Sequence, residues 1–600
     1  MTKFSTRLST VLTAAFAVVA LGIPGMLRAV PAFPGIIMAE QPDGTTVPVR
    51  MVGDERGHRV MTTDGHLLLE DASGFLTYAE ADTRGLPMAS SMRVTAPESR
   101  GAAEIQYLST LRKPNVTAAF DAVERMAATA REAGQARRYL CSGASFPASN
   151  SPAALVVLVE FSDKSFSMDN PHDFYTRLLN EKGFSDYNAT GSARDFFIEN
   201  SSGVFTPDFD VFGPVQLQHP MRHYGANNAW GQDVAPEEIV IEACRELDGK
   251  IDFSKYDTNS DGQIDNVFIF YAGYGEADSN QANTIWPHSA DILDFALGED
   301  YYFDGKLLNR YGMTNEIDYV ARRPDGIGTF VHEFSHVMGL PDLYDTLYGS
   351  SFTPGHYSTM DMGPYNNSGR TPPHFSSFER YCLDWLTPEP LTAAGEYELE
   401  ALHISNKAYL IATEKPDEFF LLENRQQECC DAYIPGHGML VWHIDYVEKP
   451  WNDNIVNNIP SHQYVDLVEA DDKRLEADRD GDLFPGTRNV REFSEKTSPA
   501  LLSWNGNKLG ILGLTDISEE NGVIRFKAIS DTSTTVETIA TDASITTDGD
   551  MILNSTDAPA GVYNLSGAKI AEIPAGGSLT LDAGLYIVSN ASGRLKVRIK

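Results

Sequence analysis

The spacing of apolar and polar positions changes several times along the 600-residue chain, and each change predicts a different kind of element. Near the N-terminus, short alternating runs such as VPVRM (47–51), LLLE (67–70) and FLTYA (75–79) stand between Asp-Gly and Gly-Asp turns, which is typical of small β-strands. An Ala-, Glu- and Arg-rich stretch, 116–135, has the composition of a helix. A Ser/Pro/Ala-rich linker follows, and we place a domain boundary near Ser151.

Beyond that boundary, continuous apolar runs predict buried strands, and one longer pattern predicts a helix. ALVVLVEFSD (154–163) and VFIFYAG (267–273) have the length and β-branched content of core strands. GIGTFVHEFSHVMGL (326–340) predicts a helix that Gly339 ends. After a Thr-Pro-Glu-Pro turn, strand follows strand, which predicts a β-sandwich of roughly 140 residues. The runs are YELEAL (397–402), AYLIATE (408–414), EFFLLENR (418–425), GMLVWHID (438–445) and VIRFKAI (523–529).

The first residues have the pattern of a secretory signal peptide. Lys3 and Arg7 precede an apolar run, 8–23, and small residues follow near Ala29. A membrane anchor is the alternative, but the run is short for a bilayer span, and no other stretch approaches that length.

These patterns divide the chain into an α+β catalytic part and mainly β flanking parts. A Ser/Thr/Asp-rich linker separates a last set of short strand-like runs from the rest. The predicted parts are a signal peptide (1–29), a propeptide (30–150), a catalytic domain (151–388), a β-sandwich domain (389–532), a linker (533–545) and a small C-terminal β domain (546–600).

Charge and cysteine content narrow the function classes. Asp and Glu outnumber Lys and Arg 84 to 47, for a net charge of −37, and such a surface repels phosphate backbones, so we expect no nucleic-acid partner. The five cysteines are an odd number and form no Cys-x-x-Cys pair, so neither a thiolate zinc site nor a thioredoxin-type motif is indicated.

The predicted helix contains the candidate metal ligands and the candidate base. His332 and His336 stand four residues apart, so both imidazoles can face one ion, and Glu333 is placed beside a metal-bound water. Two nitrogen ligands, a Lewis acid and a carboxylate that takes a proton are what metal-assisted hydrolysis requires. Gly339 can adopt positive φ and turn the chain so that Asp342 comes under the metal. This pattern predicts a Zn²⁺ site with Glu333 as general base.

HEFSHVMGLPDLYD (332–345) resembles the zinc signature of the immune inhibitor A-like metallopeptidases, the M6 family, in the metzincin-type group. The resemblance implies that Asp342 is the third zinc ligand, beside His332 and His336. Further blocks resemble the same family and together cover most of 151–530. They are 192–215, IWPHS (285–289), EFFLLENRQ (418–426), PGHGMLVWHID (435–445) and GDLFPGT (481–487).

The resemblance also implies a methionine turn beneath the metal. Met360, in HYSTMDMGPYN (356–366), is the candidate, and Met362 is its competitor. Some relatives place a tyrosine two residues after the methionine to stabilise the tetrahedral intermediate, but this chain has Met362 there. Tyr365 and His443 are the substitutes we consider for that role.

Two acidic loops are candidate Ca²⁺ sites. Alternate oxygen-bearing residues around a glycine can wrap the ion, although the first loop lacks the closing Glu of an EF-hand, and a solvated turn is the alternative for both. The candidates are Asp257, Asn259, Asp261, Gln263 and Asp265 in the first loop and Asp478, Asp480 and Asp482 in the second.

The flanking parts indicate export. Enzymes of this type are generally made as zymogens, and Cys141, near the end of the propeptide, could in principle cap the zinc, although its surroundings do not match a cysteine switch. The runs 562–570, 578–588 and 594–600 resemble the sorting domains of Bacteroidetes type IX secretion cargo. This implies a secreted or cell-surface protein of a Gram-negative, Bacteroidetes-like bacterium, with the outer-membrane secretion machinery as a partner.

The function predicted from the sequence is a secreted, calcium-stabilised zinc endopeptidase that acts on proteins or peptides. Two alternatives stay open at this point. One is a catalytically inactive surface adhesin or glycan-binding protein on a peptidase scaffold, suggested by the β-rich C-terminal half. The other is a zinc hydrolase that acts on a non-peptide bond.

Overall fold

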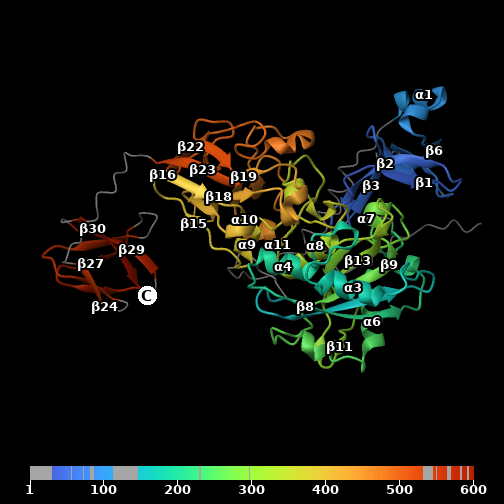
Figure 1. Ribbon diagram of the computed structural model, residues 1–600, viewed down its shortest axis with the longest axis horizontal. Coiled ribbons are helices and arrows are strands. Elements are labelled where there is room, and N and C mark those ends of the chain that lie inside the picture. The colour runs from blue at the N-terminus through green and yellow to red at the C-terminus, as the bar shows by residue number, and fades with distance from the viewer. Residues whose placement is uncertain are drawn as a thin grey trace, which may run out of the picture.

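The computed structural model describes residues 30–55, 57–71, 73–81, 87–111, 146–228, 231–295, 297–415, 417–530, 545–548, 551–563, 569–581, 584–590 and 593–599. Figure 1 shows a small N-terminal sheet against a mixed helix-and-sheet region, a β region beside it, and a small C-terminal β domain at the far end. The mixture of helices and sheets predicted from the sequence is therefore present. The predicted signal peptide, the helix 116–135 and Cys141 lie outside the described residues.

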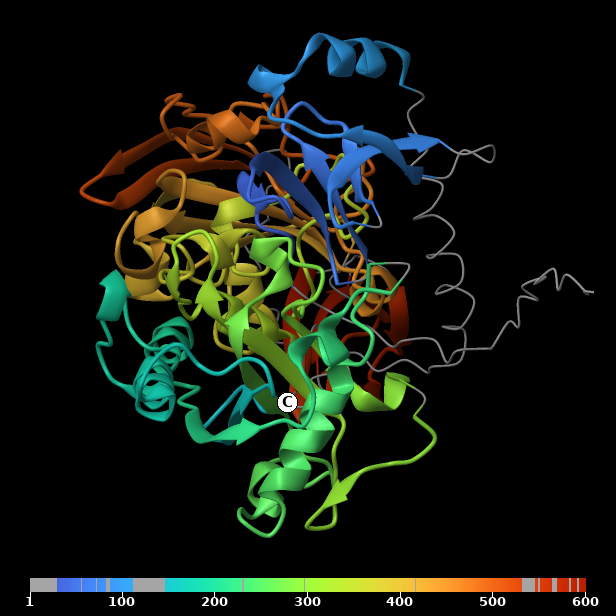
Figure 2. The same ribbon diagram turned by 90° about the vertical axis from the view of Figure 1, so that its right-hand side faces the viewer.

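The N-terminal sheet is a six-stranded antiparallel meander whose strand order follows the sequence. Ile37, Ala39 and Val49 point inward and pack in one apolar cluster with Ala277 and Trp286 of the next region, and Figure 2 shows the sheet lying against that region. The strands are β1 (Ile37–Glu40), β2 (Thr46–Asp54), β3 (Gly57–Thr62), β4 (Leu67–Glu70), β5 (Leu76–Ala81) and β6 (Pro87–Arg93), and α1 (Ala102–Thr110) follows them.

The mixed region is built on a sheet in the order β10-β13-β9-β7-β8. Its strands are β7 (Ala153–Glu160), β8 (Asp208–Gln216), β9 (Val267–Tyr274), β10 (His288–Asp291) and β13 (Arg310–Asp318). Strands β8, β7, β9 and β13 run parallel, and β10 is antiparallel to β13. In β7, Val156 and Leu158 pack on one face, and Val157 and Val159 on the other. Both faces are buried, which explains the continuous apolar run in the sequence.

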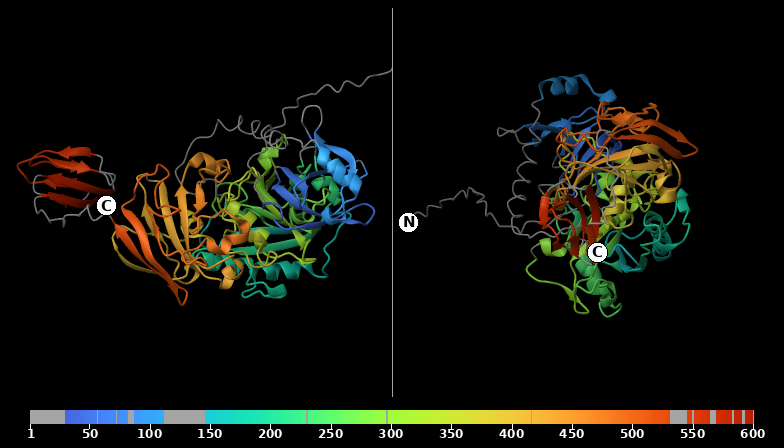
Figure 3. Two further views of the ribbon diagram at one scale, coloured as in Figure 1. Left: turned by 90° about the horizontal axis from the view of Figure 1, so that it is seen from above. Right: turned by 90° about the vertical axis from the view of Figure 1, so that its left-hand side faces the viewer.

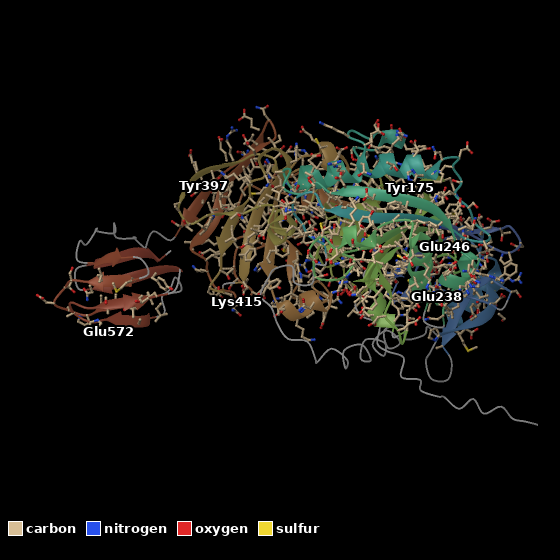
Figure 4. All side chains as sticks on the ribbon, turned by 90° about the horizontal axis from the view of Figure 1, so that it is seen from below. Tyr175, Glu238, Glu246, Tyr397, Lys415 and Glu572 are labelled. Atoms are coloured by element: carbon tan, nitrogen blue, oxygen red, sulfur yellow. The ribbon has the colours of Figure 1, made fainter. Side chains whose placement is uncertain are left out.

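Helices cover the two faces of this sheet. On one side lie α3 (Pro171–Asn180), α4 (Ala193–Asn200) and α8 (Gly328–Val337), and on the other lies α6 (Pro236–Leu247). The apolar side of α6 is buried, whereas Glu238 and Glu246 stand on its exposed side (Figure 4). Shorter elements of the mixed region are α5 (Met221–Gly225), α7 (Glu276–Ser279), α9 (Ser377–Cys382), β11 (Tyr302–Phe303), β12 (Lys306–Leu307) and β14 (Arg323–Pro324).

The β region consists of two sheets that share a core. The first, in the order β15-β17-β18-β19-β20, comprises β15 (Glu389–Pro390), β17 (Tyr409–Ala412), β18 (Glu418–Arg425), β19 (Gly438–Asp445) and β20 (Val465–Leu467). The second, in the order β16-β23-β22-β21, comprises β16 (Gly395–Leu399), β21 (Phe493–Ser494), β22 (Ile511–Glu520) and β23 (Val523–Ser530). Two short helices, α10 (Leu402–Ser405) and α11 (Glu448–Asn452), lie in the connections.

The first sheet of the β region also packs against the mixed region. In β18, Phe420 and Leu422 face the second sheet, whereas Phe419 and Leu421 belong to the same core as Phe330 of α8. Successive strand residues point to opposite faces, so one strand serves two cores. The boundary predicted at residue 388 therefore separates two parts of the sequence but not two independent cores.

The C-terminal β domain has a core of its own, which includes Ile552, Val562 and Val588. Figure 3 shows this domain at one end of the molecule. Its strands are β24 (Ile545–Asp548), β25 (Met551–Asn554), β26 (Ala560–Tyr563), β27 (Lys569–Ile573), β28 (Ser578–Thr580), β29 (Gly584–Asn590) and β30 (Gly593–Ile599). Strand β24 thus begins one residue before the predicted domain start. In the described residues, no helix has the length and hydropathy of a membrane span.

The shared core predicts a large stability loss on the face of β18 that meets the mixed region. Leu421→Ala removes a fully buried side chain and should cost about 2–5 kcal/mol because it leaves a cavity. Ile404→Ala, at a side chain that is 68% exposed, is the control and should change stability by less than about 0.5 kcal/mol. Denaturant midpoints monitored by tryptophan fluorescence measure both. Equal midpoints for the two variants would contradict the shared core.

Candidate metal centre

Helix α8, with every residue buried, carries the two candidate histidines in the middle of the molecule. At its start, the Gly328 amide donates to the Gly369 carbonyl at 2.7 Å. A side chain at Gly328 would meet the Pro364 carbonyl at 2.0 Å, so only glycine allows this close approach. At the other end, Gly339 has φ +99°, which is the left-handed turn expected from the sequence.

The turn at Gly339 brings three candidate ligand atoms together. The Nε2 atoms of His332 and His336 lie 3.2 Å apart, and each lies 3.2 Å from Oδ1 of Asp342. All three side chains are 0% exposed. Tetrahedral ligands at about 2.0 Å from a metal stand about 3.3 Å apart. The donor triangle therefore has the dimensions of a metal site, as the sequence predicts.

Each imidazole is oriented by a backbone carbonyl. Nδ1 of His332 lies 2.8 Å from the Thr359 carbonyl, and Nδ1 of His336 lies 2.8 Å from the Leu340 carbonyl. Since a carbonyl only accepts, both Nδ1 atoms carry the proton, and both Nε2 lone pairs point toward Asp342. This tautomer is the one that binds a metal through Nε2.

Asp342 is fixed by Asn454 through two hydrogen bonds. Nδ2 of Asn454 donates to Oδ2 of Asp342 at 2.5 Å, and the Asp342 amide donates to Oδ1 of Asn454 at 2.7 Å. Oδ1 of Asp342 is buried and has no hydrogen-bond partner of its own. Burial would raise the pKa of Asp342, but His336 and His332 lower it below the ordinary value. The carboxylate is thus held ionised, with one oxygen directed at the histidines.

Two further asparagines hold the chain that follows Asp342. Asn457 donates to the Leu343 carbonyl at 2.7 Å, and the Thr346 amide donates to Asn458 at 2.9 Å. The sequence analysis did not identify Asn454, Asn457 or Asn458. The one signal was the asparagine-rich run WNDNIVNN (451–458), which begins in the last two residues of α11.

Glu333 lies beside the donor triangle and is fully buried. One of its carboxylate oxygens lies within 4.8 Å of ligand atoms of both histidines. Burial and the negative charge of Asp342 raise the pKa of Glu333 well above its ordinary value. Oε1 accepts a hydrogen bond of 2.7 Å from the backbone nitrogen of Val30, and Oε2 is buried without a partner.

The first described residues lie across this site. The Val30 carbonyl accepts from Nε1 of Trp286 at 3.0 Å, and the Pro31 carbonyl accepts from the Tyr365 hydroxyl at 2.6 Å. The Phe33 amide donates to the Ala277 carbonyl at 2.9 Å. Residues 30–33 thus contact Glu333 and are held by hydrogen bonds to Trp286, Tyr365 and Ala277.

Comparison with known proteins agrees with this geometry. Residues 148–387 match the family model described as the immune inhibitor A peptidase M6 catalytic domain. We call residues 148–387 the M6 domain because of this match. Its metallopeptidase family implies a bound metal, and the buried donor triangle with an unpartnered oxygen fits one.

Three relatives share part of this sequence. The pre-pro-metalloprotease PrtV of Vibrio cholerae is 27% identical over 277 residues, which are 40% of this chain and 29% of PrtV. Immune inhibitor A of Bacillus thuringiensis subsp. alesti is 28% identical over 267 residues, 37% of this chain and 38% of that protein. A putative secreted metallopeptidase of Arthroderma benhamiae is 23% identical over 225 residues, 33% and 32% of the two chains. The alignments therefore span about a third of each relative.

The segment predicted as the methionine turn runs next to α8 in the M6 domain. Met360 is 0% exposed, packs in the core with Phe330, and accepts from the Leu343 amide at 2.8 Å. Met362 is only half-buried. These contacts favour Met360 for the turn, an assignment that stays a prediction.

Of the two substitutes for the missing tyrosine, Tyr365 lies nearer the centre. It holds the same N-terminal segment that covers Glu333. His443 makes its contacts in the β region, with Glu418 at 3.0 Å and stacked against Phe420 and Trp504.

The first acidic loop is closed by its own hydrogen bonds. Gly262 has φ +92°, and Asp257 accepts from the amides of Asp261 and Gly262. Oδ2 of Asp257 also lies 2.5 Å from Nζ of Lys306, which lowers the pKa of Asp257. Asp265 accepts from Thr258, and burial raises its pKa to about 6. Lys306 supplies a cation that the sequence pattern did not reveal. Ca²⁺ binding here stays a prediction, and the ion would have to compete with the ion pair between Lys306 and Asp257.

The three candidates of the second loop have different surroundings. Asp478 pairs with Lys473 at 3.0 Å and with Arg488, whereas Asp480 is exposed. Asp482 is 0% exposed, and both of its oxygens lack hydrogen-bond partners. Burial raises its pKa to about 8. In the part of the chain that the structure describes, neither acidic loop brings ligand atoms of three His, Cys, Asp or Glu side chains within 4.8 Å of one another.

Asn454 should control metal affinity through Asp342. Asn454→Ala removes both hydrogen bonds to the candidate ligand and should weaken zinc binding 10–100-fold, as losses of partners that orient ligands do. Competition with a zinc chelator measures the affinity. Asn458→Ala loosens the same loop without touching Asp342 and should have a much smaller effect. Equal losses in the two variants would mean that Asn454 acts only through loop packing.

Proposed function

We propose that the chain is a secreted zinc endopeptidase that is made as a zymogen and hydrolyses peptide bonds in proteins or peptides. Its catalytic domain would be of the metzincin type, followed by a β-sandwich. The observation that carries the proposal is the triangle of His332, His336 and Asp342 with Glu333 beside it, buried inside an M6 domain. The complete set of donors and base argues against an inactive adhesin.

Each residue of the centre would have a separate role in hydrolysis. When bound by the three donors, zinc would supply a Lewis acid that polarises the peptide carbonyl and the attacking water. Glu333 would take the proton of that water and pass it to the leaving amine. Tyr365 would donate a hydrogen bond to the developing oxyanion.

The N-terminal region would keep the enzyme latent. The Val30 nitrogen donates a hydrogen bond to Glu333. Residues 30 and 31 are bound by Trp286 and Tyr365, and they would exclude a substrate backbone from this position. Signal peptide cleavage after residue 29 would leave a cationic α-amino group at this position. PrtV is named a pre-pro-metalloprotease, which is consistent with a precursor.

Export and calcium complete the proposal. The signal-peptide pattern, and a relative named as secreted, support secretion or cell-surface display. The C-terminal domain, with its separate core, would serve as a sorting signal for an outer-membrane secretion machinery. The loop 257–265 would bind Ca²⁺ by displacing Lys306 from Asp257.

Glu333→Gln should abolish casein hydrolysis while zinc content stays at the wild-type level, because the amide cannot take a proton. We expect a loss of at least about 10³-fold after the N-terminal region has been removed. His332→Ala should lose both zinc and activity, and a chelator should silence the wild type. Activity that survives in Glu333→Gln, or in the chelated enzyme, would refute the proposal.

Undocking the N-terminal sheet should raise the activity of the unprocessed chain. Ala32 is 4% exposed and packs in the cluster between the sheet and the M6 domain, so Ala32→Asp should release the segment 30–33 at the cost of a buried charge. Met38→Asp places the same charge at a side chain that is 49% exposed and serves as the control. Hydrolysis of a fluorogenic peptide should rise several-fold for Ala32→Asp alone. Equal activities of the Ala32→Asp and Met38→Asp variants would contradict the proposed latency.

A further inference from the structure

A second group of metal-ligating side chains lies outside the site described above. Glu199 lies in the last turn of α4, His374 precedes α9, and Cys430 lies in the 3₁₀ turn Cys429–Tyr433. Nε2 of His374 lies 3.0 Å from Oε1 of Glu199, and Sγ of Cys430 lies 3.9 Å from Oε2 of Glu199. One donor atom from each of the three residues lies within 4.8 Å of the other two. Three distant segments thus meet at a single point.

His374 is oriented as a metal-ligating histidine is. Its Nδ1 lies 3.1 Å from Oδ2 of Asp431, and Asp431 is held in turn by Nε of Arg425 at 2.7 Å. All three side chains are buried. With Nδ1 directed at Asp431, Nε2 is left to face Glu199 and Cys430, as in carboxylate–histidine–metal arrangements.

The contacts among the three side chains are unequal. A proton on Nε2 of His374 can bridge to Glu199, but the Cys430 thiol, 3% exposed, has only a weak contact at 3.9 Å. His403 stacks on His374, with ring centroids 5.6 Å apart, and its Nε2 lies 3.6 Å from Glu428 rather than at the thiol. An ion would replace the protons of both His374 and Cys430 and satisfy all three donors.

The donor set selects the class of metal. A thiolate with an imidazole and a carboxylate suits zinc, whereas calcium and magnesium prefer oxygen ligands. Tetrahedral zinc would place the nitrogen and sulfur about 3.3 and 3.5 Å from a ligating carboxylate oxygen. The nitrogen lies 3.0 Å from Oε1 of Glu199 and the sulfur 3.9 Å from Oε2, so each distance is within about 0.4 Å of that value, although to different oxygens. Thiolate and carboxylate together neutralise a divalent charge. The Glu199 side chain is 33% exposed, so an ion can enter from solvent.

We propose that Glu199, His374 and Cys430 bind a second transition-metal ion, zinc in the first instance, which ties the M6 domain to the β region. Glu199 and His374 belong to the M6 domain, and Cys430 follows β18 of the β region. The ion holds these segments together and takes no part in hydrolysis, so the site stands independently of the proposed function.

Cobalt distinguishes the two metal sites. The full chain with His332→Ala and His336→Ala, loaded with Co²⁺, should bind one equivalent and show a sulfur-to-cobalt charge-transfer band in the near ultraviolet. The donor triangle at Asp342 contains no sulfur, so it contributes no such band. Adding Cys430→Ser should abolish the band and weaken Co²⁺ binding at least 10-fold. Glu199→Gln should weaken binding at least 10-fold and keep the band.

Two other cysteines provide the controls. Cys382→Ser, at another buried thiol, and Cys141→Ser should leave the band and the stoichiometry unchanged. A chain that binds no cobalt once His332 and His336 are replaced would overturn the proposal. So would a band that survives Cys430→Ser, or one that only Cys429→Ser removes. If Cys430→Ser does not fold, the Glu199→Gln variant is the test. A Co²⁺ affinity of Glu199→Gln equal to that of the parent chain would also overturn the proposal.

Discussion

The pair of hydrogen bonds between Asp342 and Asn454 is the constraint on which the rest of the structure depends. It places a buried, ionised carboxylate oxygen 3.2 Å from each of two imidazole nitrogens. In a dry interior, a carboxylate oxygen that faces two imidazole nitrogens needs either protons or an ion between these groups. Helix α8, the glycine turn at 339 and the carbonyls of Thr359 and Leu340 all serve to hold this triangle.

Because Asn454 belongs to the β region, that region takes part in building the centre. Its first sheet presents one face to the M6 domain and the other to its partner sheet, so the loop carrying Asn454 is anchored in a continuous core. The segment before the N-terminal sheet also reaches the centre, because the Val30 nitrogen donates to Glu333. Elements more than a hundred residues apart in the chain thus define one buried site.

Local features of this arrangement were predictable from the sequence. The helix, its glycine stop and the strands 153–160, 267–274 and 418–425 follow from periodicity and length, because those signals depend on neighbouring residues. Long-range pairings left no such signal. Asn454 lies 112 residues from Asp342, and Val30 lies 303 from Glu333. Lys306 beside Asp257, and the meeting of Glu199, His374 and Cys430, likewise arise only when the chain folds.

Anomalous diffraction at the zinc edge, from crystals of the zinc-loaded chain, would locate the metal. We expect a peak within about 2.0–2.2 Å of Nε2 of His332, Nε2 of His336 and Oδ1 of Asp342, with Asn454 still bonded to Oδ2. A peak bound by both histidines but out of bonding distance of Asp342, or no peak between the three residues, would contradict this expectation.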